Sequence, residues 1–256
     1  MDTINDKDSI HLGGTARSPE DVRALHKLGL QFAEIPMTDP DKVSALKKTY
    51  RDLSQQTGLY YLCHGPREGD PNDTELLETS YFPKLLRVIE IMPYLDMRLL
   101  TIHLWMDPRF VKPEAIAYKM GFLNRLLDYG RETGVEICLE NLSETATHLS
   151  QIFELLPRLN LTLDIGHAQL LSSRNTSHGF IERFPEKIRH VHIHDNRGGD
   201  SPLDDLHLPV GKGIIDFGRM FRKLKAIGYH RTFTLELRPE QIKTCLSSVK
   251  NLLIMA

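Results

Sequence analysis

The chain is poor in cysteine and has no long apolar run. Its 256 residues include three cysteines, Cys63, Cys138 and Cys245, which lie far apart and form no CxxC pair. This usage argues against a disulfide framework or a thiolate zinc site and favours the reducing cytoplasm. No apolar stretch approaches the roughly 20 residues that cross a bilayer, which excludes an integral membrane protein. The polar opening segment, MDTINDKDSI, is not expected to be a signal peptide.

The chain also lacks an excess of charge of either sign. Lys and Arg number 32, Asp and Glu number 34, and the formal net charge is -2. A protein that wraps nucleic acid by its net positive charge is therefore excluded, although a locally basic groove is not. Hydrophobic residues make up 41% of the chain, enough for a sizeable core. The composition has one outlier, its 12 histidines, most of which stand beside β-rich segments.

Short β-branched or aliphatic runs alternate eight times with amphipathic helical stretches. The expected strands span residues 10–15, 31–37, 59–65, 99–105, 135–141, 159–166, 188–195 and 232–238. Helix starts such as Ser18-Pro19 and stops such as Gly58 separate them. This alternation, with no break in composition, predicts one domain over residues 1–256, a single parallel (β/α)8 TIM barrel. A doubly wound open sheet is the alternative, weakened because no GxGxxG motif follows the first strand.

Six consecutive expected strands carry His, Asp or Glu close to their carboxyl ends. In a parallel barrel these ends meet at one rim, where active sites lie. Glu140 and Glu236 each stand within an apolar strand, where an unpaired charge is costly to bury. Any single histidine could be structural, but a shared divalent cation compensates clustered carboxylates and fixes neutral imidazoles. We therefore predict a metal site at the barrel mouth.

Three segments resemble the xylose-isomerase-like barrel superfamily, which includes sugar-phosphate isomerases and epimerases and the apurinic endonuclease IV family. These segments read LDIGHA (163–168), VHIHDN (191–196) and HLPVGKGIID (207–216). The isomerase pattern implies four metal ligands, Glu140, Asp164, His192 and Glu236. The endonuclease IV pattern implies five more, His64, His103, His167, Asp205 and His207. The resemblance therefore implies one to three divalent ions, Zn²⁺ or Mn²⁺.

One ligand stays open at this point. His194 shares strand parity with His192, so either imidazole could face the ion, with the strand register as the only arbiter.

Several loops depart from the endonuclease pattern. Residues 67–70 read Arg-Glu-Gly-Asp, where the endonucleases carry an aromatic and apolar wedge. The loop at residues 37–41 is acidic, and residues 198–205 carry three Asp and no base, so a DNA backbone would be repelled. A nucleic-acid partner is therefore disfavoured, and the expected partner is a small carbohydrate or keto acid.

The resemblance implies a metal-dependent isomerase or epimerase that acts on a small sugar, sugar phosphate or hydroxy-keto acid through an enediolate. Glu140 and Glu236 would exchange the proton next to the carbonyl, and His167 would orient a substrate oxygen. Loops after the seventh and eighth strands are the usual anion corner of such barrels, where Arg197, Lys212 or Arg238 could hold a phosphate or carboxylate. Trp105 could wall a sugar ring.

Two alternatives remain open. The nine-ligand count also fits a zinc-dependent phosphoesterase resembling apurinic endonuclease IV, in which Glu140 would bridge two ions. The apolar segment 247–255 could close the barrel or form a subunit contact, so a homo-oligomer is a further possibility.

Overall fold

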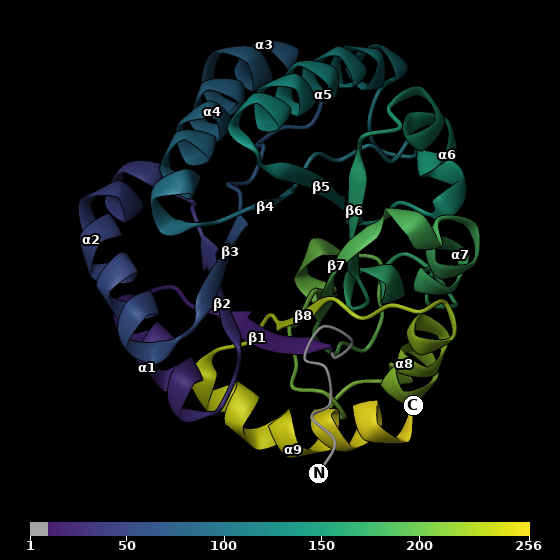
Figure 1. Ribbon diagram of the computed structural model, residues 1–256. Coiled ribbons are helices and arrows are strands. Elements are labelled where there is room, and N and C mark those ends of the chain that lie inside the picture. Colours follow the sequence, from purple (N-terminus) through teal and green to yellow (C-terminus); the bar gives the residue numbers. More distant parts are fainter. Residues whose placement is uncertain (1–9) are drawn as a thin grey trace.

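The expected barrel is present in a computed structural model that describes residues 10–256 (Figure 1). Within that range the strands are β1 (His11–Thr15), β2 (Phe32–Pro36), β3 (Tyr60–His64), β4 (Leu99–Ile102), β5 (Glu136–Glu140), β6 (Asn160–Asp164), β7 (Ile188–Ile193) and β8 (Thr232–Leu235). Each pairs in parallel with its neighbours in chain order, and β8 pairs with β1 to close the sheet. The prediction of a parallel (β/α)8 barrel is confirmed.

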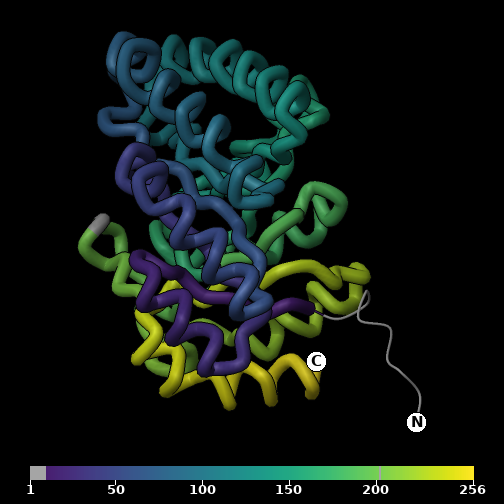
Figure 2. Tube along the Cα trace, turned by 60° about the vertical axis from the view of Figure 1, so that its left-hand side comes forward, coloured from purple at the N-terminus to yellow at the C-terminus, as the bar shows by residue number. Residues whose placement is uncertain are grey.

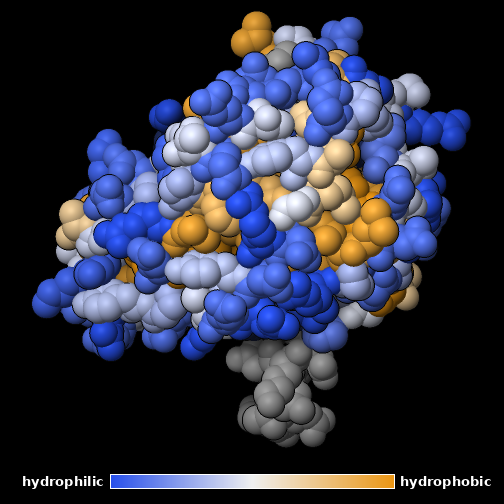
Figure 3. All heavy atoms as spheres, turned by 90° about the horizontal axis from the view of Figure 1, so that it is seen from above, coloured by the Kyte–Doolittle hydropathy of each residue, from blue (hydrophilic) through white to orange (hydrophobic). Residues whose placement is uncertain are grey.

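Helices form a ring around the strands (Figure 1). They are α1 (Pro19–Lys27), α2 (Pro40–Thr57), α3 (Thr74–Leu76), α4 (Phe82–Ile91), α5 (Pro113–Thr133), α6 (Ala146–Leu155), α7 (Ser177–Arg183), α8 (Phe217–Ala226) and α9 (Pro239–Met255). Short turns of other helix types are η2 (Leu77–Tyr81), η3 (Met92–Leu95), η4 (His167–Gln169), η5 (Pro185–Lys187) and η6 (Pro202–Asp204). On the side of the molecule seen in Figure 3, hydrophilic side chains predominate and apolar patches lie between them.

The predicted helix boundaries have the expected chemistry. Ser18 caps α1 by accepting a hydrogen bond from the Asp21 amide at 3.2 Å, and Pro19 occupies the first helical position. Gly58 ends α2 with φ of 75°, a left-handed conformation that favours glycine. The strands end earlier than expected, β4 at Ile102 and β8 at Leu235, because the chain turns into the rim loops there.

Alternation along the strands separates the packing face from the barrel interior. On β7, Val191 and Ile193 belong to the core between sheet and helices, while His192 points inward on the opposite parity. The amino-terminal end of the interior is filled by an apolar plug that includes Phe32 and Cys138. The interior therefore changes from apolar at one end to ionisable at the other, where the strands' carboxyl ends lie.

The last helix completes the ring of helices. α9 contacts α1, α8 and β1, and Figure 2 shows it beside α1. It begins at Pro239 and so includes the apolar segment 247–255, while Ile254 and Met255 remain exposed. Closure of the barrel is thus one role of this segment. A subunit contact stays a prediction.

The opening segment, for which no signal peptide is expected, falls mostly outside residues 10–256. Across residues 10–256, no helix is both long and apolar enough to cross a membrane.

Candidate metal centre

Glu140 lies at the centre of the ionisable rim. Its fully buried carboxylate projects from the end of β5 among four imidazoles, which come from β3, β7, η4 and the loop after β4. Oε2 lies 2.8 Å from His103 Nε2 and 3.2 Å from His64 Nε2. Oε1 lies 3.1 Å from His192 Nδ1 and 3.2 Å from His167 Nδ1. Side chains far apart in the chain therefore meet at one carboxylate because the strand ends converge.

Glu236 completes a group of four around the same point. Its Oε1 lies 3.3 Å from His192 Nδ1 and 3.9 Å from His64 Nε2. Together with Glu140, these residues offer ligand atoms that all lie within 4.8 Å of one another. Two carboxylates and two imidazoles are an acceptable donor set for zinc or manganese.

A second group forms around Asp205, in the loop between β7 and α8. Its Oδ2 lies 3.1 Å from His207 Nε2 and 3.3 Å from His167 Nε2, and its Oδ1 lies 3.8 Å from His194 Nδ1. The rings of His194 and His207 stack with centroids 3.9 Å apart. This group also offers ligand atoms within 4.8 Å of one another.

Asp195 shapes the loop that carries this second group. Its carboxylate accepts hydrogen bonds from the amides of Gly211, Gly213 and Ile215 at 2.9, 2.9 and 3.2 Å. Its backbone pairs with Leu208 in both directions. This anchoring holds the intervening His207 in a left-handed conformation, φ 44°, with its ring toward the rim.

Asp164 connects the two groups. Its Oδ1 accepts from the His167 amide at 2.5 Å and lies 3.2 Å from His194 Nε2. Its Oδ2 lies 3.6 Å from His167 Nδ1 and 3.7 Å from His192 Nδ1. All nine ligands implied by the resemblance thus lie at one rim, although their role as ligands stays a prediction.

The structure places His192 and His194 in two different groups of candidate ligands. His192 belongs to the group with His64, Glu140 and Glu236, whereas His194 belongs to the group around Asp205. Both imidazoles point inward, as their shared parity requires, but His194 lies two residues nearer the carboxyl end of the barrel than His192. The structure therefore offers a place for both rather than a choice of one.

Sequence reasoning underrated Glu34. It projects inward from β2, is 1% exposed, and lies 3.1 Å from His192 Nε2 and 3.4 Å from His190 Nε2. An ion-paired or solvated carboxylate is the ordinary expectation for Glu34 near the end of the second expected strand, and the structure shows the ion pair at full burial. Its position inside an apolar strand, like that of Glu140, is the signal that could have found it.

The charges of the rim stabilise one another. Burial would raise the pKa of Glu140, but the adjacent His103 and His192 hold it well below its usual range. Burial would likewise lower the pKa of His64, but Glu140 and Glu236 raise it to about 9. The pKa of His207 rises to about 9 against the effect of burial, because Asp205 accepts its hydrogen bond. A divalent cation bound here would replace the protons on these imidazoles, because histidine binds metal in its neutral form.

Unpartnered buried atoms test whether a metal fits. Within residues 10–256, Asp164 Oδ2, Asp205 Oδ1 and both ring nitrogens of His194 are buried and make no well-aligned hydrogen bond, although His194 Nε2 lies 3.2 Å from Asp164 Oδ1. Buried polar atoms in proteins are nearly always partnered, by protein, water or an ion. The four atoms are oxygen and nitrogen donors at the two ligand groups, so the residues present fit a divalent cation.

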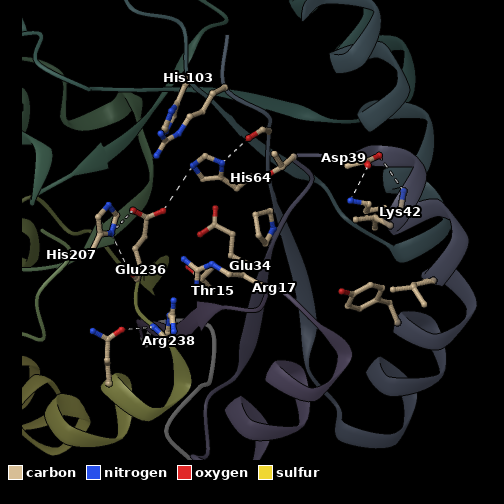
Figure 4. A pocket seen from close by; sticks show the side chains of 18 of the residues that line it. Thr15, Arg17, Glu34, Asp39, Lys42, His64, His103, His207, Glu236 and Arg238 are labelled. Atoms are coloured by element: carbon tan, nitrogen blue, oxygen red, sulfur yellow. Dashed lines mark hydrogen bonds and ion pairs between the residues drawn. The ribbon is translucent and has the colours of Figure 1, made fainter. Parts of the chain in front are cut away.

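A cavity of about 820 Å³ opens above this rim (Figure 4). Its lining includes His64, His103, His167, His207 and Glu236 at one end and side chains of α2 at the other. The volume lies within the range of roughly 300–1,000 Å³ that is common for small-molecule sites.

The predicted substrate-binding residues divide into two sets. All three are exposed; Arg238 lines the cavity, whereas Arg197 and Lys212 are not among its lining residues. Trp105 is also outside the lining: its indole nitrogen donates to Ser143 Oγ at 2.7 Å. The substrate contacts expected of these residues stay predictions. Arg17, which lines the cavity, was not singled out from the sequence.

The sequence profile of the xylose isomerase-like TIM barrel matches residues 22–252. The chain belongs to this family. Among curated proteins, it is 29% identical over 220 residues to the uncharacterized protein MJ1614 of Methanocaldococcus jannaschii, covering 79% of this chain and 81% of that one.

Solved structures share the fold over nearly the whole chain. A D-tagatose 3-epimerase-like protein superposes with a TM-score of 0.79 and 21% identity, covering 96% of this chain and 98% of that one. The IolI protein with a bound zinc atom gives 0.78 and 19%, covering 95% and 98%. D-allulose 3-epimerase from Methylomonas sp. in complex with D-allulose gives 0.76 and 17%, covering 95% and 97%.

Proposed function

We propose that this protein is a divalent-metal-dependent isomerase or epimerase that acts on a small carbohydrate or hydroxy-keto acid through an enediolate. The observation that carries the proposal is the pair of carboxylates, Glu140 and Glu236, on either side of His192 Nδ1 at 3.1 and 3.3 Å. Glu236 lines a cavity of suitable size, and Glu140 contacts two of the other lining residues, His64 and His103. The epimerase titles of several structural neighbours favour the same class of reaction.

His64, Glu140, His192 and Glu236 would hold the ion, with His64 in the place that the isomerase pattern gives to Asp164. A divalent cation bound there supplies positive charge that polarises a carbonyl and stabilises an enediolate. Zinc in the IolI neighbour supports zinc as one candidate, and manganese is the other. The second group, around Asp205, has room for further ions.

Glu236 is the carboxylate best placed to begin the reaction. It lines the cavity with a side chain 12% exposed, whereas the Glu140 side chain is fully buried. Glu236 would accept the proton from the carbon next to the carbonyl, and the electron pair of that C–H bond would become part of the enediolate. Glu140 would return a proton and so complete an isomerisation or epimerisation. His167, which also lines the cavity, would orient a substrate oxygen.

Solvent exchange tests this proposal directly. Protein reconstituted with Zn²⁺ or Mn²⁺ in D₂O should incorporate deuterium into a ketose or keto acid from a panel of free, phosphorylated and carboxylated compounds. Glu236→Gln should lose at least about 100-fold of this exchange, in line with general base catalysis. Glu154→Gln, an exposed change of the same kind on α6, is the matched control. Absence of exchange across the whole panel would refute the proposal.

A zinc-dependent phosphoesterase is the second candidate, because the group around Asp205 could hold ions beyond the first. In that case Asp205→Asn should abolish phosphate-ester hydrolysis. Under the isomerase proposal the same variant should retain most of its deuterium exchange, since Asp205 is not in the group with Glu236.

We also propose that the protein resides in the cytoplasm. Cys63, Cys138 and Cys245 are all free and buried, as in proteins of reducing compartments.

A further inference from the structure

We propose that Arg17 and Arg238 form an anion subsite in the cavity, and that the substrate is a carbohydrate carrying a phosphate or carboxylate group. This inference rests on the proposed function, because it names the substrate class of the same cavity. The sequence predicts the anion-binding site in the loops after β7 and β8, whereas the proposed subsite lies where β8 and β1 meet.

Closure of the barrel brings the two arginines to the same part of the rim. β1 and β8 are paired strands, with Gly14 in register with Leu235. Arg17 comes three residues after Gly14, and Arg238 comes three residues after Leu235. The two segments therefore leave the sheet at a similar level along the barrel axis. Both arginines line the cavity, and Figure 4 places them in the same part of it, below Glu34 and Glu236.

Neither guanidinium group is neutralised by the surrounding protein. Within residues 10–256, neither Arg17 nor Arg238 makes an ion pair. By contrast, Lys42 at the other side of the cavity pairs with Asp39 at 3.5 Å. The two arginines are therefore free to meet a ligand.

The carboxylates that share the cavity are committed elsewhere. Glu34 lies against the imidazoles of His190 and His192, and Glu236 lies against those of His64 and His192. The cavity thus has an inner end of carboxylates and imidazoles. Beside it lie lining arginines that make no ion pair within residues 10–256, namely Arg17 and Arg238 at the junction of β8 and β1, and Arg67 after β3. A neutral sugar would use only the inner end, whereas an anionic sugar would use both.

The chemistry of arginine favours phosphate and carboxylate equally. A guanidinium group presents a planar fork of N–H donors that matches both anions in two parallel hydrogen bonds. α9 begins directly after Arg238, so the positive end of its dipole adds to the positive charge there. Phosphate and carboxylate both present anionic oxygens to the arginines, and the experiment below distinguishes the two groups.

The test compares a neutral ketohexose with its 6-phosphate and with the corresponding ketohexuronate in the deuterium-exchange assay. One anionic form should exceed the neutral sugar in kcat/KM by about 10- to 100-fold, the effect of a charge-assisted hydrogen bond. Arg17→Met and Arg238→Met should each remove most of that preference through KM. Arg219→Met, an exposed arginine on α8 with no ion pair in residues 10–256, should keep it. Preference for the phosphate or for the uronate identifies the anion.

Equal kcat/KM for neutral and anionic sugars, or variants that lower both alike, would overturn the inference. Calorimetry with inorganic phosphate separates this failure from that of the proposed function. If no compound undergoes exchange, phosphate binding that is lost in Arg17→Met and Arg238→Met would still support the subsite. Absence of phosphate binding to the wild-type protein, together with no preference in exchange, would refute it.

Discussion

Replacing Glu34 by glutamine tests whether a buried carboxylate beneath the rim orients His192. Glu34 Oε1 lies 3.2 Å from His192 Nε2, and Oε2 lies 3.4 Å from His190 Nε2. The first contact favours Nε2 of His192 as a donor, so that an ion held by Glu140 and Glu236 would find the Nδ1 lone pair once its proton is displaced. Both carboxylate oxygens contact His192 Nε2, because Oε2 lies 3.1 Å from it as well. Glutamine has nearly the same shape, but it is neutral and replaces one of these acceptor oxygens by an amide that donates. His192 therefore loses one of its two acceptor contacts and the negative charge behind it.

The expected magnitude follows from the role of carboxylates that hold metal-binding histidines. Their loss weakens metal affinity by about 10- to 100-fold. Because each tenfold change corresponds to about 1.4 kcal/mol, Glu34→Gln should cost about 1.4–2.8 kcal/mol of binding free energy. The effect should be confined to binding, since the side chain remains buried and of similar volume.

Chelator competition with Zn²⁺ and Mn²⁺ at fixed pH measures the dissociation constants. Circular dichroism establishes that the variant is folded, and Glu154→Gln on the exposed face of α6 is the control. A folded Glu34→Gln protein whose dissociation constants stay within twofold of wild type would show that Glu34 does not orient a ligand. The assignment of His192 Nδ1 as a metal-binding atom would then fall as well.

Three further predictions concern stability. Lys119→Met should destabilise the fold by about 3–5 kcal/mol in urea unfolding, because Lys119 is fully buried and pairs with Glu68 at 2.8 Å. Adding Glu68→Gln to this variant should restore part of the lost stability. A Lys119→Met protein as stable as wild type would contradict the reasoning. Hydrogen bonds from Arg125 and Tyr118 lower the pKa of Glu78 from 4.5 to about 2. The ionised Glu78 therefore stabilises the fold fully above pH 4.5, and this stabilisation is lost as the pH falls toward 2. Arg125→Met should accordingly lower Tm at pH 7 by more than at pH 2.5, and equal shifts would refute this. Chelation should lower Tm by about 5–10 °C relative to protein at 100 times the metal dissociation constant, and Zn²⁺ or Mn²⁺ should restore it; an unchanged Tm would argue against a bound ion.

The barrel could be predicted from the sequence because its signals are local. Apolar strands, proline at helix starts and glycine after helix ends act over a few residues, and eight such units have one common solution. The rim followed from the same pattern. Glu140 and Glu236 stand in apolar runs of the sequence, so their need for a compensating partner was visible before the fold was known, although β8 itself ends one residue before Glu236.

Strand parity tells only whether a side chain points inward, and therefore could not separate His192 from His194 or give Glu34 a partner. Height along the barrel depends on how each strand is staggered against its neighbours, which arises only when the sheet closes. Closure also brings Glu34 across the interior to His192 and sets Arg17 beside the strand that precedes Arg238. Local patterns thus determined the architecture and the rim. The contacts between distant strands, which need the complete barrel, decided how the rim is divided into metal ligands, their supports and the unpaired cations.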